Sequence, residues 1–134
     1  MRYDASKAPD PQEWLDLDES ERLDLVISYH KRAKLPVGES NRLHAVAHVI
    51  VENQIAMGDA TVVPATLDRL MREGLDRHDA LHAIGSVLVG IVFDAIKSPK
   101  GKEIDVNAQY GRELAQLSAA SWRRGSGRCV TTTD

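Results

Sequence analysis

The sequence predicts a single all-α domain, a compact five-helix bundle around one buried apolar helix. Three observations lead to this expectation. Apolar residues recur three and four positions apart through most of the chain, which is the pattern of helices with one buried face. Capping residues, prolines and glycines divide the pattern into segments of helical length. The alternation of apolar and polar residues that marks half-buried strands is missing.

The N-terminal quarter is expected to form an arm followed by a helix. Residues 1–12 carry two prolines among mixed polar residues and predict an irregular arm, which Trp14 can pin to the body of the protein. Asp18 and Glu21 have the N-cap and N3 spacing of a capping box, so a helix begins near Asp18. Its apolar stripe continues for about four turns and includes His30.

Four further helices are expected, each bounded by a cap, a proline or a glycine. They span residues 40–57, 65–72, 76–97 and 105–122. Gly58 is placed to close the first of these in the left-handed conformation. Asp76 caps the third, with Asp79 at its N3 position. Residues 123–134 bury too little apolar area to offset their ordering entropy, so a disordered tail should follow a single helical domain of residues 1–122.

Bulk properties argue against two classes of partner. The net charge is −3 without a basic patch, so neither nucleic acid nor an anionic membrane surface is expected. The longest apolar run, residues 80–93, is interrupted by His82, Gly85 and Ser86 and falls short of the roughly 18 residues of a spanning helix. No signal peptide is recognisable. The single cysteine, Cys129, fits a reducing compartment, and we expect a cytoplasmic protein.

The helix expected over residues 76–97 is apolar around most of its circumference. Such a helix is normally buried on all sides, yet a domain this small can enclose it only partly. Gly85 and Gly90 each cost about 1 kcal/mol relative to alanine in a helix interior, which the close approach of another backbone or a ligand would offset. We therefore expect a homodimer in which part of this helix meets a second copy.

Four of the five histidines form two pairs at helical spacing, His44 with His48 and His78 with His82. Residues four apart on a helix differ by about 40° around its axis, so each pair shares one face. Glu52 extends the first line by one more turn. Both lines border apolar faces, and the two stretches align without gaps. Both pairs should therefore face the interior or a cleft.

Two such pairs facing each other predict a divalent-metal site. Imidazoles at i and i+4 can both reach one ion, and two opposed helices bring four together. The expected ligands are His44, His48, Glu52, His78 and His82. Imidazole with carboxylate suits zinc, iron or nickel better than magnesium or calcium. In an open site, a metal-bound water could serve hydrolysis with Glu52 as the catalytic base.

One alternative is that the histidines are structural. A histidine on an apolar helix face is often a hydrogen-bonded core residue, and Glu52 would then bond Arg42, Arg69 or Arg77. The chain also lacks the Glu-x-x-His repeats of di-iron bundles and the His-Glu-x-x-His of zinc peptidases. On this interpretation the protein is a non-enzymatic homodimeric interaction or regulatory module.

A second alternative uses His78 and Asp79 as the doublet of the HD-type phosphohydrolases, which are helical metal enzymes. An upstream histidine and a downstream aspartate would complete the set. The candidates are His44 or His48, and Asp94 or Asp105. Asp79 also stands at N3 of a helix, where an acid is favoured for electrostatic reasons alone.

Two segments carry a resemblance to a known family. They are His-x-x-x-His-x-x-Val-Glu-Asn-Gln-Ile-Ala-Met-Gly-Asp at 44–59 and Arg-Leu-Met-Arg-Glu-Gly-Leu-Asp-Arg-His-Asp-Ala-Leu-His-Ala-Ile-Gly-Ser-Val-Leu at 69–88. They resemble a family of small bacterial proteins catalogued as a domain of unknown function, over the middle third to half of the chain. The resemblance implies a small helical cytoplasmic protein distinguished by its paired histidines and Glu52, and it implies no particular activity.

Overall fold

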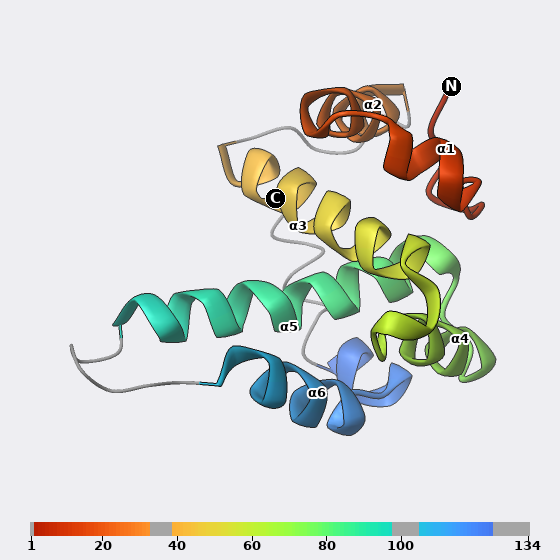
Figure 1. Ribbon diagram of the computed structural model, residues 1–134. Helices are drawn as coiled ribbons and strands as arrows, with labels where there is room; N and C mark the ends of the chain where they lie inside the picture. Colours follow the sequence, from red (N-terminus) through yellow and green to blue (C-terminus); the bar gives the residue numbers. More distant parts are fainter. Residues whose placement is uncertain (1, 33–38, 98–104, 125–134) are drawn as a thin grey trace.

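The computed structural model of the protein describes residues 2–32, 39–97 and 105–124 (Figure 1). Within these ranges the chain contains helices and no strand, so the all-α prediction is confirmed. The helices are α1 (Pro11–Asp16), α2 (Glu19–Arg32), α3 (Glu39–Ala56), the 3₁₀ turn η1 (Gly58–Ala60), α4 (Val63–Arg72), α5 (Arg77–Lys97) and α6 (Val106–Gln116). A last helical stretch covers residues 119–124.

Helix boundaries agree with the prediction where a local signal marks them. Asp18 Oδ1 accepts the Glu21 N–H at 2.9 Å and Glu21 Oε1 accepts the Asp18 N–H at 3.1 Å, which is the reciprocal pair of a capping box. Asp76 Oδ1 accepts the Asp79 N–H at 2.8 Å at the start of α5. Gly58 follows α3 with φ +64°, a conformation that glycine adopts without strain.

The helix α1 was not predicted. Asp10 caps it by accepting the Glu13 N–H at 3.0 Å, and Pro11 occupies a first-turn position where its missing N–H costs nothing. The proline that suggested an irregular arm is therefore a helix start. At the other end, the helix expected over residues 105–122 stops at Gln116. Ser118 Oγ then accepts the Ser121 N–H at 3.0 Å and begins the next helical stretch.

The helix α5 packs against α3 on one side and against α4 and α6 on the other (Figure 1). Its first half is buried, and Gly85 there faces Ala47 of α3, whose Cβ lies 3.7 Å from a Cβ built on the glycine. Its second half projects, with Val92, Phe93 and Ile96 exposed by 45%, 46% and 73%. The expected buried central helix is thus found mainly in the first half of α5, with Ile91 the buried residue of the second half.

Among the described residues, α5 is also long and apolar enough to cross a bilayer. This differs from the expectation that the interruptions at residues 82, 85 and 86 rule out a spanning run. The core helix of a soluble protein passes the same test of length and composition. In this fold α5 begins with Arg77, which is 5% exposed and ion-paired inside the protein.

The N-terminal arm packs onto the core. Tyr3, Ala5 and Trp14 are each at most 1% exposed, and the Trp14 indole N–H donates to Asn53 Oδ1 of α3 at 2.8 Å. The expected pinning of the arm by Trp14 is therefore found. The predicted disordered tail, including Cys129, lies outside the described residues from 125 onward, whereas residues 123 and 124 belong to the last helical stretch.

Candidate metal centre

All five histidines gather where α2, α3 and α5 meet. His30 comes from α2, His44 and His48 from α3, and His78 and His82 from α5. One nitrogen from each of His30, His48, His78 and His82 lies within 4.8 Å of those of the other three. The His78 and His82 ring centroids are 4.1 Å apart, and those of His44 and His82 are 4.2 Å apart. The expectation that the two histidine pairs face each other is confirmed.

Hydrogen bonds determine which nitrogen carries the proton in two of these rings. His30 Nδ1 lies 2.8 Å from Val26 O; because a carbonyl only accepts, Nδ1 is protonated and Nε2 holds the lone pair. The Tyr3 hydroxyl donates to Glu52 Oε2, so it accepts from His48 Nε2 at 2.7 Å. His48 Nδ1 therefore holds the lone pair. Burial and the nearby Glu52 raise the pKa of Tyr3, so its hydroxyl keeps its proton.

Three shielded imidazole nitrogens have no hydrogen-bond partner in the part of the chain that the structure describes. They are His30 Nε2, His48 Nδ1 and His78 Nε2. Buried polar atoms are nearly always satisfied, and an unsatisfied one costs about 1–3 kcal/mol. For His30 and His48 the unpartnered atom is the one that holds the lone pair. Such a group is what a metal ion would satisfy.

Burial keeps the imidazoles neutral, which is the form that binds metals. At every ring, burial is the largest cause of a lowered pKa. At all of them but His30, the charge of neighbouring imidazoles lowers the pKa further. Together they lower the pKa of His48 well below its ordinary value, that of His78 to about 4 and that of His82 to about 2. The pKa values of His30 and His44 are lowered in the same direction.

Glu52, the expected carboxylate ligand and base, faces a different partner. Arg77 donates from Nη1 to Oε2 and from Nη2 to Oε1, both at 2.8 Å, and the Tyr3 hydroxyl also bonds Oε2. Glu52 is 1% exposed and does not belong to the convergent group of nitrogens. Both of its oxygens are therefore engaged. In this arrangement Glu52 orients Tyr3, and through Tyr3 it orients the ring of His48. Of the arginines considered for Glu52, Arg77 bonds it and Arg69 bonds Glu73, while the side chain of Arg42 lies outside the described part of the structure.

His44 lies at the rim of the cluster. Its side chain is exposed, and its Nε2 lies 2.9 Å from His82 Nε2. It is not one of the four residues whose nitrogens converge. The place that the sequence assigned to His44 is filled by His30, an unpaired histidine four residues after the fully buried Val26. The position of His30 on the apolar stripe of α2 could have indicated that its side chain points inward. Because no second histidine lies three or four residues away, the sequence did not mark it as a metal ligand.

The HD-type set is not assembled. Asp79 is half-buried and its amide belongs to the cap of α5, while its carboxylate is not in the convergent group. Asp94 and Asp105 are exposed, and the Asp105 carboxylate caps α6 by accepting the Ala108 N–H at 3.0 Å. The four clustered groups are all histidines.

Comparisons with family models, with curated proteins and with solved structures found no match to this chain. A function for this chain must therefore be inferred from the geometry of the site.

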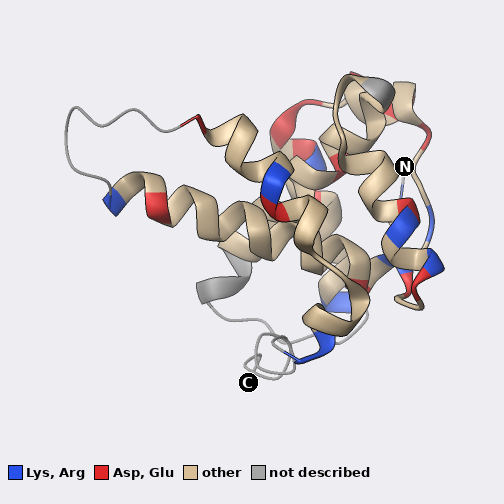
Figure 2. Ribbon diagram, turned by 90° about the horizontal axis from the view of Figure 1, so that it is seen from below, with Lys and Arg blue, Asp and Glu red and all other residues tan. Residues whose placement is uncertain are grey.

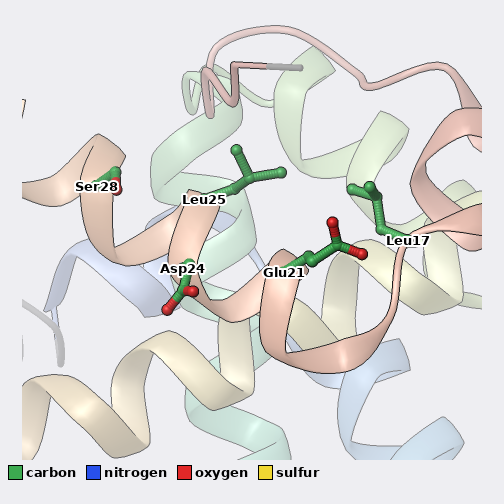
Figure 3. Close-up of a pocket in the computed structure, with 5 residues that line it drawn as sticks. All are labelled: Leu17, Glu21, Asp24, Leu25 and Ser28. Atoms are coloured by element: carbon green, nitrogen blue, oxygen red, sulfur yellow. The ribbon is translucent and has the colours of Figure 1, made fainter.

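A shallow hollow of about 250 Å³ lies apart from the histidines, lined by Leu17, Glu21, Asp24, Leu25 and Ser28. Figure 3 shows the two leucines and the Glu21 carboxylate at its border.

Proposed function

We propose that this protein binds one divalent transition-metal ion through His30, His48, His78 and His82. The observation that supports this is the convergence, within 4.8 Å, of imidazole nitrogens from three helices, with three shielded nitrogens unpartnered. Ligands at about 2.0–2.1 Å in a tetrahedral site lie about 3.3 Å from one another. Loading the site thus requires the nitrogens to approach by at most about 1.5 Å, which small side-chain rotations supply.

The donor set favours metal binding over hydrolysis. Four neutral imidazole nitrogens suit zinc, iron or nickel better than magnesium or calcium. Four protein ligands also complete a tetrahedral zinc shell, as in structural sites, whereas catalytic zinc sites keep a position for water. Glu52, the base expected for hydrolysis, is held by Arg77 and Tyr3. The function we propose is therefore the binding of a metal ion.

Metal analysis of protein purified without a polyhistidine tag tests this proposal. After dialysis against zinc, iron or nickel, we expect close to one equivalent of a metal per chain. At 100 times its Kd the metal should stabilise the fold by about 2.7 kcal/mol. His48→Ala and His78→Ala should abolish both effects. Ser86→Ala is the matched control on α5, because within the described residues the Ser86 hydroxyl bonds its own helix, at the His82 carbonyl at 3.1 Å.

The structural-histidine alternative predicts the opposite result. Less than about a tenth of an equivalent of metal, together with an unchanged melting temperature on adding each metal, would contradict metal binding. The cluster would then be a set of neutral core imidazoles in an interaction module. Wild-type stability in His30→Ala, which removes a ring packed against four other imidazoles, would contradict that structural role.

We further infer a homodimer that forms through the projecting half of α5. Val92, Phe93 and Ile96 are exposed there, and Figure 2 shows this end of the helix as tan apart from a red segment and a blue tip. Contiguous exposed apolar side chains typically mark interaction surfaces. Sedimentation at micromolar concentration should show a dimer for the wild type and a monomer for Phe93→Asp. A monomeric wild type would contradict the inference.

A further inference from the structure

We propose that His44 is the exchange ligand of the four-histidine site, the residue through which the metal enters and leaves. The protein would then pass its metal on and would not hold it permanently. This role rests on the proposed function, because it requires that the four-histidine site bind a metal. The source and the acceptor of the metal are a hydrated ion or a weak small-molecule chelate, either of which can reach an exposed imidazole.

The first support is the position of His44. It is the one histidine of the five with an exposed side chain, whereas His48 is buried and the remaining three are half-buried. Its Nε2 lies 2.9 Å from His82 Nε2, and the His82 ring centroid lies 4.1 Å from that of His78. Imidazoles therefore follow one another without interruption from the surface into the convergent group.

The second support is the chemistry of the bond between the two rings. Two Nε2 atoms 2.9 Å apart share one proton, because one must donate and the other accept. With His44 as the donor, His82 Nε2 presents a lone pair and His44 keeps a lone pair on Nδ1. Loading through this lone pair forms a metal–nitrogen bond at His82 Nε2 and breaks the hydrogen bond, while the proton stays on His44. His30 and His48 also hold lone pairs on their unpartnered nitrogens, so neither of them has to lose a proton.

The same bond makes the step reversible. His44 and the metal compete for His82 Nε2, so His44 stabilises the metal-free ring as the ion departs. Four other nitrogens already complete a tetrahedral shell, so the approach of His44 adds a fifth donor for the duration of the transfer. Catalytic zinc sites can expand to five ligands in the transition state, and the transfer through His44 would use the same expansion. His44 therefore acts on the rates of uptake and release and leaves the stable coordination to the four other rings.

The experiment measures zinc exchange with Zn²⁺ alone. Release into excess EDTA and uptake by the metal-free chain are followed by rapid mixing for the wild type, His44→Ala and His44→Gln. Both variants should still bind one equivalent of zinc, and their affinity should be no weaker than that of the wild type, because they lose a hydrogen bond that holds the metal-free His82. Both rates should be roughly tenfold slower. Leu43→Ala is the matched control, because this neighbour on α3 is 45% exposed and should exchange at the wild-type rate.

Three results would overturn the role of His44. Equal rates in His44→Ala and wild type would show that the metal takes another route. A loss of affinity as large as that of His48→Ala would make His44 a permanent ligand. A wild-type chain that binds no zinc, iron or nickel would instead remove the proposed function, and that failure is visible before any variant is compared.

Discussion

Replacing Tyr3 with phenylalanine removes one hydroxyl from the buried network and leaves the ring in place. The ring packs against Trp14, Tyr29 and His48 with centroid distances of 5.5–5.6 Å, and phenylalanine preserves these contacts. The variant loses the hydrogen bond to Glu52 and the acceptor that lies 2.7 Å from His48 Nε2. It therefore isolates the role of the hydroxyl in holding one tautomer of His48.

The expected loss of stability follows from those two bonds. A hydrogen bond to a charged group contributes about 1.5–3 kcal/mol, and a buried donor left without a partner costs about 1–3 kcal/mol. The two costs do not add in full, because Arg77 still bonds the Glu52 carboxylate after the hydroxyl is removed. We therefore expect the free energy of unfolding to fall by about 2–4 kcal/mol. For a chain of this size this corresponds to a decrease of about 8–16 °C in Tm.

Zinc affinity should fall as well. Without the Tyr3 hydroxyl, the proton of His48 can move to Nδ1, the atom that should face the ion. Because the hydroxyl orients a metal ligand in this way, its removal should weaken zinc binding about 10–100-fold. Urea unfolding followed by circular dichroism and titration with Zn²⁺ measure the two effects.

Tyr29→Phe is the control for both measurements. Its ring packs edge-on against His78 at 5.4 Å, yet it makes no hydrogen bond to a histidine in the described ranges. It should therefore unfold and bind zinc like the wild type. A Tyr3→Phe variant that loses less than about 0.5 kcal/mol and binds zinc normally would refute the tautomer reasoning.

Three further predictions concern pH, the buried ion pair and the cap of α5. Unfolded imidazoles take up protons below about pH 6.5, whereas folded His78 and His82, with pKa values of about 4 and about 2, stay neutral. Without metal, the free energy of unfolding should therefore fall by roughly 2–4 kcal/mol from pH 7 to pH 5 after allowance for solvent screening, and a flat urea-derived profile would contradict this. Arg77→Met should cost about 3–5 kcal/mol because it leaves the buried Glu52 charge without its ion-pair partner, and adding Glu52→Gln should restore part of the melting temperature. Asp79→Asn should keep the wild-type zinc stoichiometry, whereas loss of both metal and a phosphatase activity would favour the HD-type alternative.

Local signals account for the helix boundaries that could be predicted. The reciprocal bonds of Asp18 and Glu21, and the bond from the Asp79 amide to Asp76, join residues three apart, so they can be read before the fold is known. The helix α1 was missed because Pro11 is compatible with both a helix start and an irregular arm. What distinguishes them is Trp14, whose complete burial comes from packing against distant parts of the chain.

Caps and the 3.6-residue period act within a few residues, so the helical fold and the shared helix faces of His44 with His48, and of His78 with His82, could be predicted from the sequence. By contrast, the membership of His30 in the convergent group and the pairing of Glu52 with Arg77 come from the packing of the helices. Those pairings join helices far apart in sequence, and their geometry depends on how the helices cross. The choice of protonated nitrogen likewise depends on which distant donor or acceptor packing places beside each ring.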